Sequence, residues 1–187
     1  MEESQSELIV MLTDLVEKLG DQEYKVQCTH YWPGEVGKTW YLEENRSITL
    51  KLEEFVMQIE DEGLWHSELN LTVNDETRMI HHYWLKGWRD GKGLKNFMLL
   101  NELLERMCEN LKANPVKPPI IHCSGGVVRA ETVIGGYLAK HLLIWEPPNI
   151  DVKEAAFRNY PVFAFTAFPS FAYFRTTSNI KSPCSVD

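Results

Sequence analysis

The hydrophobic positions in the first half of the chain follow the patterns of β-strands. Residues 8–12, with the sequence LIVML, form a continuous apolar run of the length that suits a buried strand. Around residues 48–52, apolar positions alternate with polar ones, which predicts another strand. Residues 65–73 and 77–85 also alternate, and the Asn74-Asp75 pair between them favours a tight turn. We therefore expect these last two segments to form a hairpin.

A short helix is predicted directly after the first strand. Residues 14–19 follow Thr13, whose hydroxyl can cap a helix, and they precede Gly20, which can end one.

The hydrophobic period becomes helical in the second half of the chain. Over residues 94–113, apolar side chains recur with helical spacing, and Asn114-Pro115 ends the pattern. The side chains predicted to share one apolar face are Phe97, Leu100, Leu104, Met107 and Leu111.

Strand and helix patterns alternate after this helix. Ile120-Ile121 suits a short buried strand. Residues 129–144 are typical of a helix that ends near Pro147-Pro148, and residues 151–158 of a shorter helix capped by Asp151. Strands and helices in this order imply an α/β or α+β domain.

Length and charge narrow the classes of partner. A chain of 187 residues has the size of one domain and can bury a substantial core. Its net charge is −8 and it contains no long basic run, so we expect neither nucleic acid nor an anionic membrane as a partner. No apolar stretch approaches the roughly 18 residues needed to span a bilayer, and the N-terminus lacks the pattern of a signal peptide.

The cysteine pattern indicates a reducing compartment rather than a fold held by disulfide bonds. Cys28, Cys108, Cys123 and Cys184 form no CxxC pair and have no regular spacing. A disulfide framework is therefore not expected, and the pattern favours a reducing compartment, which we interpret as the cytoplasm.

The strongest chemical pattern lies in the segment IIHCSGGVVRAET, which begins at Ile120. Gly125 and Gly126 let the backbone turn sharply after the expected strand, so successive amide N–H groups can converge on one anion. The helix that follows adds the positive end of its dipole. The segment therefore predicts a loop that binds phosphate.

Cys123 and Arg129 would supply the chemistry of this loop. The loop amides and the helix N-terminus favour the thiolate of Cys123, which is the nucleophilic form of the side chain. The planar guanidinium of Arg129 can hold two oxygens of a phosphoryl group at once. The alternative is a buried, inert cysteine near an unrelated arginine, and it explains neither the glycines nor the spacing.

The segment HCSGGVVR resembles the signature of the protein tyrosine phosphatases, in which five residues separate His-Cys from Arg. The resemblance runs from about residue 8 to the C-terminal tail. The other matching segments are Ile9–Thr13, Glu17, Cys28, Tyr31–Pro33, Thr77-Arg78, Ile80, His82-Tyr83 and Ile150–Val152. The resemblance implies an α/β fold with a mixed central sheet flanked by helices and the phosphate loop at a strand-to-helix turn.

The same resemblance implies hydrolysis of phosphotyrosine in protein substrates through a phosphocysteine intermediate, without a metal or an organic cofactor. Cys123 would attack phosphorus while Arg129 holds the oxygens, and His122 would support the nucleophile. The further residues expected to bind the phosphoryl group are Ser124, Gly125, Gly126, Val127 and Val128.

A second segment resembles the acid loop of the family. Trp88-Arg89-Asp90 stands where the family has Trp-Pro-Asp, whose aspartate protonates the leaving tyrosine oxygen. The resemblance therefore assigns Asp90 as the general acid and Trp88 as a supporting residue. The alternative is a solvated aspartate in a turn next to Gly91.

Several residues depart from the family pattern. Arg89 replaces the proline of the acid loop, and Val128 replaces a glycine of the phosphate loop. Ala130 stands where the family has a serine or threonine whose hydroxyl helps phosphocysteine to break down. Glu131 replaces a glycine and adds a negative charge near the anion site.

The late part of the chain also departs from the family. If Thr166 corresponds to the threonine of the family's late Gln-Thr loop, then Phe165 replaces the glutamine that positions the hydrolytic water. No glutamine follows Gln58. We therefore expect reduced turnover.

Two other classes of function stay open. A pseudophosphatase would bind phosphotyrosine or a protein partner without catalysis, and Val128, Ala130 and Glu131 favour it. A sulfur-transfer enzyme also uses a cysteine in an anion loop, but it does not need the acid Asp90.

We expect one tyrosine-phosphatase-like domain over residues 1–187 that lacks the N-terminal part of the family. The family's phosphotyrosine-recognition loop, with its stacking tyrosine, precedes the segment that resembles residues 9–33, and the first eight residues contain no tyrosine.

His81 and His82 are the histidines considered as metal ligands. Adjacent residues of a strand point to opposite faces of the sheet. No other residues are spaced to complete a site with either of them, so no metal site is expected.

Overall fold

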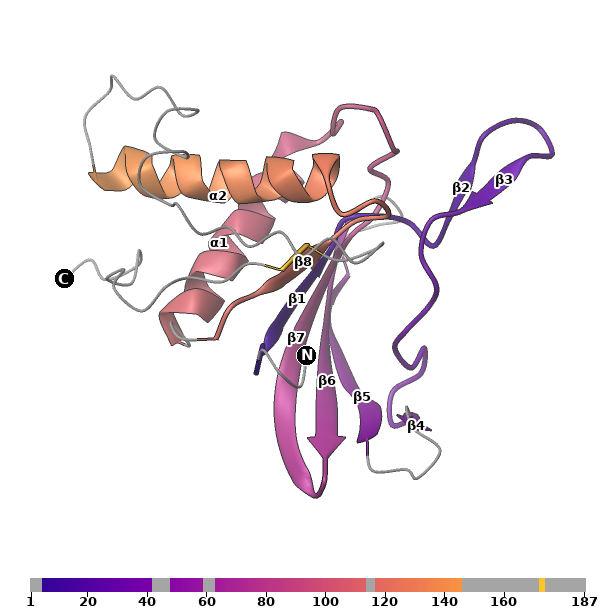
Figure 1. Cartoon of the computed structure of the whole chain (residues 1–187), viewed down its shortest axis with the longest axis vertical. Helices are drawn as coiled ribbons and strands as arrows, with labels where there is room; N and C mark the ends of the chain where they lie inside the picture. Colours follow the sequence, from indigo (N-terminus) through magenta and orange to yellow (C-terminus); the bar gives the residue numbers. More distant parts are fainter. Residues whose placement is uncertain (1–4, 42–47, 59–62, 114–116, 146–171, 174–187) are drawn as a thin grey trace.

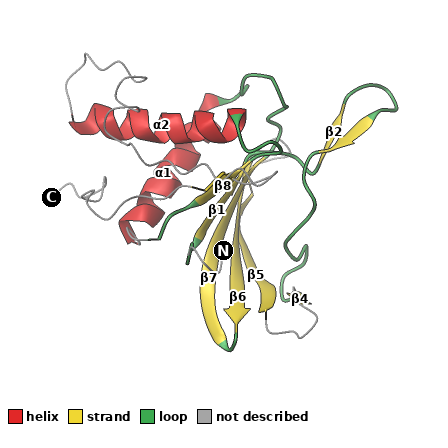
Figure 2. Cartoon of the chain, viewed as in Figure 1, coloured by secondary structure: helices red, strands yellow, loops and turns green. Residues whose placement is uncertain are grey.

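The computed structural model describes residues 5–41, 48–58, 63–113, 117–145 and 172–173 (Figures 1 and 2). Its strands are β1 Leu8–Met11, β2 Val16–Lys18, β3 Tyr24–Val26, β4 Thr39–Tyr41, β5 Ile48–Gln58, β6 Leu64–Val73, β7 Glu76–Leu85, β8 Ile120–His122 and β9 Ala172–Tyr173. Its helices are α1 Phe97–Ala113 and α2 Val128–Trp145.

A mixed sheet of seven strands forms the centre of the fold, in the order β4-β5-β6-β7-β1-β8-β9. β1 runs parallel to both of its neighbours, β7 and β8, whereas the other adjacent pairs are antiparallel. Every residue of β1 is buried, which explains why its sequence is a continuous apolar run. The α/β class, the mixed sheet and the flanking helices are as expected.

The hairpin of β6 and β7 forms as predicted. Val73 pairs with Glu76, and the two residues between them have positive φ angles of 48° at Asn74 and 69° at Asp75. Positive φ at both central residues is the geometry of the two-residue turn that matches the twist of paired strands.

The sheet buries a different cluster of side chains on each face. Leu8, Val10 and Tyr83 face the helices and pack with residues of α1 and α2, such as Leu103 and Val133. The opposite face carries a second cluster, which packs against the loop that holds Tyr31 and Trp32. In Figure 1 the two helices lie on the same side of the sheet. The phosphate-loop strand β8 is therefore enclosed between two layers.

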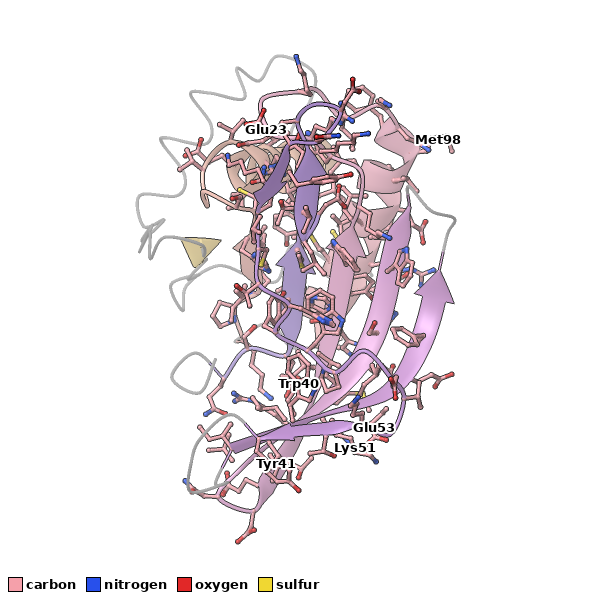
Figure 3. All side chains as sticks on the ribbon, turned by 90° about the vertical axis from the view of Figure 1, so that its right-hand side faces the viewer. Glu23, Trp40, Tyr41, Lys51, Glu53 and Met98 are labelled. Carbon is pink, nitrogen blue, oxygen red and sulfur yellow. The ribbon has the colours of Figure 1, made fainter. Side chains whose placement is uncertain are left out.

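Helix α1 begins at Phe97, where the Asn96 side chain accepts a hydrogen bond from the Met98 N–H at 3.0 Å. Leu104, Met107 and Leu111 are buried as their spacing predicts. Phe97 does not share this buried face, because it is 70% exposed in the first turn. The neighbouring Met98 is also exposed and lies at the edge of the molecule in Figure 3. The start of the helix thus extends beyond the core.

The helix predicted for residues 14–19 is wrong. Residues 16–18 are instead strand β2, which pairs antiparallel with β3 and projects away from the sheet in Figure 1. The Gln27 N–H also donates to the Leu15 carbonyl at 2.9 Å. A helix this short is unstable by itself, whereas pairing with β3 satisfies the same backbone groups.

Two expectations concern residues outside the described part of the chain. They are the short helix at residues 151–158 and the late positions Phe165 and Thr166. Within the described residues, neither helix combines the length and apolar character that crossing a membrane requires.

Candidate active site

The phosphate loop connects the buried end of β8 to the N-terminus of α2. The Leu12 N–H of the β1 end donates to the His122 carbonyl at 2.8 Å, which fixes the start of the loop. Cys123 follows and is 2% exposed. Gly126 has a φ of 70°, a conformation that favours glycine, and α2 begins two residues later at Val128. The expected strand–loop–helix arrangement is therefore present.

Arg129 joins this loop to two other segments from a buried position. Its Nη1 donates to the Thr13 hydroxyl at 3.1 Å and to the Trp88 carbonyl at 2.9 Å. Its Nε and Nη2 have no hydrogen-bond acceptor among the described residues, although both are buried. Leaving buried charged donors unsatisfied is costly, and these two nitrogens form one edge of the guanidinium fork. An oxyanion with two accessible oxygens would satisfy that edge.

The structure brings Asp90 to the same place. Its Oδ1 lies 3.3 Å from Arg129 Nη2, and its Oδ2 lies 3.8 Å from Lys25 Nζ of β3. The Asp90 side chain is about half exposed, so it can reach a bound molecule from the solvent side. Asp90 and Arg129, two residues singled out from the sequence, thus lie together although they are far apart along the chain.

Two anchors hold the segment around Asp90. The Gly87 N–H donates to both carboxylate oxygens of Asp14, at 3.1 and 3.2 Å. Trp88 is buried, and its indole N–H donates to the Lys92 carbonyl at 2.9 Å. The Trp88–Lys92 bond holds the acid segment in a closed loop, and the Gly87–Asp14 bonds attach this loop to the segment after β1.

A buried polar network lies below the loop. The Tyr31 hydroxyl is 2.7 Å from His122 Nε2 and 2.9 Å from His82 Nε2. Burial lowers the pKa of His122 to about 4 and that of His82 to about 3, so both imidazoles are neutral at neutral pH. The network orients His122, the residue before the cysteine.

Comparison with known proteins assigns this arrangement to a family. The family model described as protein-tyrosine phosphatase matches residues 1–157. The chain belongs to the protein tyrosine phosphatase family.

Individual relatives agree with this assignment. The chain is 28% identical over 131 residues to the human tyrosine-protein phosphatase non-receptor type 2, which covers 70% of this chain and 30% of the relative. Its structure is similar to the Trypanosoma cruzi protein tyrosine phosphatase TcPTP1, with a TM-score of 0.62 and 27% identity over 76% of this chain and 48% of the other. A structure of PTPN18 shares the fold at 17% identity, with a TM-score of 0.69 over 82% of this chain and 51% of the other. The chain therefore spans about a third of the curated relative and about half of each solved structure.

The structure places the residues that depart from the phosphatase pattern. Val128 is 64% exposed and its φ is not positive, so its side chain points away from the cradle without backbone strain. Glu131 is also exposed, and solvent screens its charge. Ala130 is fully buried and belongs to the same cluster as Cys123. Of these three residues, Ala130 is therefore the one that is buried in the same cluster as Cys123.

Sequence patterns missed three residues of this phosphatase site. Thr13 was expected to cap a helix, but its hydroxyl binds Arg129 instead. Asp14 was placed inside that helix, but it anchors Gly87. Lys25 carried no pattern, because its contact with Asp90 depends on where the β2–β3 hairpin projects. Thr13 had two indications in the sequence: it follows the apolar run of residues 8–12, and it ends the family-like segment Ile9–Thr13.

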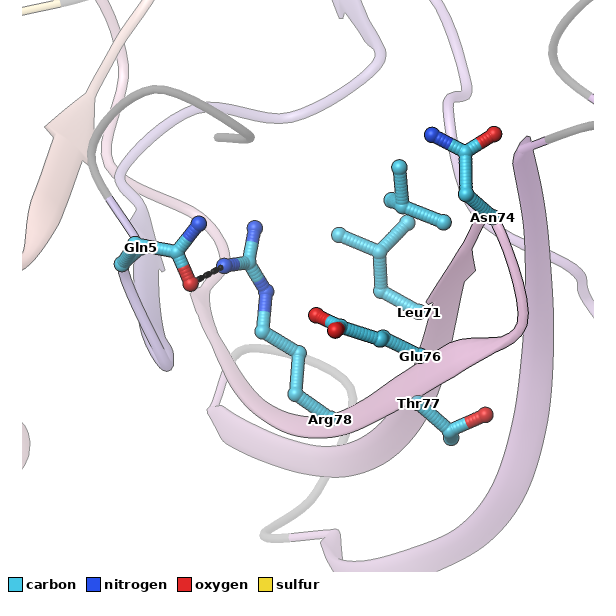
Figure 4. Close-up of a pocket in the computed structure, with 7 residues that line it drawn as sticks. Gln5, Leu71, Asn74, Glu76, Thr77 and Arg78 are labelled. Carbon is cyan, nitrogen blue, oxygen red and sulfur yellow. Dashed lines mark hydrogen bonds between the residues drawn. The ribbon is translucent and has the colours of Figure 1, made fainter.

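An open cleft of about 330 Å³ lies at the other end of the sheet, beside the β6–β7 turn. Figure 4 shows Arg78 within it, donating to the Gln5 side chain at 2.7 Å. The cleft shares no residue with the phosphatase loop or the acid segment, so we assign it no part in this site.

Proposed function

We propose that this chain hydrolyses phosphotyrosine in protein substrates through a phosphocysteine intermediate, with reduced turnover. One observation carries the proposal: the Nε–Nη2 edge of buried Arg129 makes no hydrogen bond among the described residues, and the half-exposed Asp90 carboxylate lies 3.3 Å from Nη2. A phosphoryl group supplies the paired oxygens that such an edge binds. Neither step of the proposed reaction needs a metal or an organic cofactor.

In the first step, the Cys123 thiolate attacks phosphorus and a sulfur–phosphorus bond forms. The bond between phosphorus and the tyrosine oxygen breaks, and Asp90 gives its proton to that oxygen. Arg129 and the loop amides hold the charge on the phosphoryl oxygens throughout.

In the second step, water attacks phosphorus and the sulfur–phosphorus bond breaks. Asp90, now a carboxylate, accepts a proton from the water, and phosphate and the thiolate are released. This step is where the departures at Ala130 and Phe165 would act.

Activity on a small aryl phosphate tests the proposal. Wild type should release the phenol, Cys123→Ser should release none, and Asp90→Asn should be slower by about 10²–10⁴-fold. An activity unchanged by Cys123→Ser would disprove the proposed nucleophile.

A pseudophosphatase is the second candidate function, and buried Ala130 favours it. Such a protein would bind a phosphotyrosine peptide through Arg129 but would release no phosphate. Peptide binding without any phenol release from aryl phosphate would support this function over hydrolysis. We also propose the cytoplasm as the location, from the cysteine pattern of the sequence.

A further inference from the structure

Three potential metal ligands meet on the helix-facing side of the sheet, away from the phosphate loop. His66 and Glu68 are two residues apart on β6 and therefore point to the same face. His81 of β7 lies directly opposite Glu68 in the strand register. His66 Nε2 is 3.1 Å from His81 Nδ1, which is 3.8 Å from Glu68 Oε1. All three ligand atoms lie within 4.8 Å of one another.

The cluster is both fixed and accessible. The His66 ring stacks on Tyr83 with a centroid distance of 4.2 Å and an interplanar angle of 11°, so its orientation is set by packing. His66 is 8% exposed, whereas the side chains of His81 and Glu68 are 29% and 24% exposed.

Helix α1 adds more negative than positive charge beside the cluster. Arg106 forms ion pairs with Glu102 at 2.9 Å and with Glu109 at 3.4 Å. These three charged residues lie near the Tyr83 hydroxyl, and the Tyr83 ring stacks on His66. The two carboxylates therefore offset the positive charge of Arg106, which acts on His66.

Strand β5 adds a further negative charge. Glu54 lies opposite Glu68 in the register, and like charges directly opposite each other destabilise a strand pair. Lys51, labelled with Glu53 in Figure 3, does not relieve this repulsion, because it forms an ion pair with Glu53 at 2.8 Å. Glu53 also accepts a hydrogen bond from Asn70. A cation held by Glu68 would offset the repulsion.

We propose that His66, Glu68 and His81 bind one divalent transition-metal ion of the zinc class, with water in the remaining position. Two imidazoles and a carboxylate are a donor set that Zn²⁺ accepts. Ligand nitrogens on one tetrahedral Zn²⁺ lie about 3.3 Å apart, close to the separation of the two histidines. The Glu68 side chain closes the remaining distance by rotation. The ion would link β6 to β7, the strand that leads into the acid segment.

The expectation of no metal site rested on spacing along the chain, which does not record pairing between strands. His81 and His82 do point to opposite faces, since His82 binds Tyr31 on the other side. The partners of His81 come from β6, and only the register of the hairpin brings them together.

Binding of ZnCl₂ and CoCl₂ to the full chain tests the site. A Cys123→Ser background removes thiolate binding at the phosphate loop. We expect one equivalent of Co²⁺ to bind with the intense visible absorption of a tetrahedral site, and Zn²⁺ to displace it. His81→Gln and Glu68→Gln should each weaken Zn²⁺ binding by about 10-fold or more. His30→Gln, which changes a histidine outside the cluster, should leave binding unchanged.

Thermal melting gives an independent measurement. ZnCl₂ should raise the melting temperature of the background protein but not that of the Glu68→Gln variant, which is nearly isosteric and should keep the fold. If Zn²⁺ binds the two cluster variants as tightly as the background protein, or does not bind at all, the cluster is only a hydrogen-bonded histidine pair. Either result overturns the proposal, and neither depends on phosphatase activity.

Discussion

Arg129 contacts two earlier segments of the chain, one 116 residues away and the other 41 residues away. Its Nη1 binds Thr13 at the end of β1 and the Trp88 carbonyl in the acid segment. One side chain therefore connects three segments, and its Nε–Nη2 edge makes no hydrogen bond among the described residues. A lysine has no planar fork, so Arg129→Lys should lose two-oxygen binding of an anion even where it keeps a positive charge at this position.

Oxyanion binding should depend on this fork. We expect tungstate to raise the melting temperature of the wild type, and Arg129→Lys to reduce the shift strongly, because a point charge replaces a bidentate donor. Arg106→Lys, on the exposed face of α1, is the matched control and should respond like the wild type. Equal shifts in all three proteins would contradict an anion site at Arg129.

Acid should destabilise the fold through the buried histidines. The pKa of His82 falls from 6.5 to about 3 on folding and that of His122 to about 4, so the unfolded chain binds more protons below pH 6.5. The stability present above pH 6.5 is therefore lost progressively as the pH falls toward these folded values. Urea unfolding between about pH 7.5 and about pH 4.5 measures this slope.

His82→Gln removes one of the titrating groups and should make the slope shallower. Tyr31→Phe deletes the shared hydroxyl but leaves both imidazoles, so it should lower stability with little change of slope. If the pH dependence of stability is as steep in His82→Gln as in the wild type, His82 is not one of the groups that cause it.

At the scale of the element, the β6–β7 turn has a residue type that does not suit its backbone conformation. Asp75 has a φ of 69°, which a residue with a side chain adopts at a cost. Glycine is preferred at this position of the turn because it has no such cost.

Asp75→Gly should therefore raise the free energy of unfolding by about 0.5–1 kcal/mol, whereas Asp75→Ala should lower it. Asp21→Gly is the control, since Asp21 lies in an exposed loop without a positive φ and should lose stability. Urea midpoints compare the three variants. A loss of stability in Asp75→Gly as large as in Asp21→Gly would show that the turn geometry is not limiting.

At the scale of the whole molecule, the site forms where the parallel strands β1 and β8 end and the acid segment crosses them. Asp90 lies 3.3 Å from Arg129, whereas Ala130, which stands where the family has a hydroxyl, is buried in the same cluster as Cys123. The two steps of the proposed reaction should therefore be affected unequally.

Phosphocysteine should accumulate for this reason. Mixing the protein with excess aryl phosphate should give a burst of phenol of about one equivalent, followed by a slow phase. Ala130→Ser should speed the slow phase more than the burst, while Ala113→Ser, at the far end of α1, should change neither. A time course that is linear from the start would exclude slow breakdown of the intermediate.

The local elements were predictable because their signals lie in neighbouring residues. The apolar run of β1, the alternation of β6 and β7 and the helical period of α1 each record which face is buried. The loop after β8 was predictable because its glycines, Cys123 and Arg129 are contiguous. The error at Phe97 arose because a period shows which side chains share a face, but not where along the helix the core ends.

The sequence by itself determined the fold class, the phosphate loop and the pairing of Cys123 with Arg129, since short-range backbone geometry carries all three. Tertiary structure decided what those residues contact. It turned Thr13 from a cap into a partner of Arg129, brought Lys25 to Asp90 and placed His66 beside His81. The physical reason is that the pairing register of the strands brings distant residues together. This register depends on the packing of the whole sheet, so no local sequence pattern encodes it.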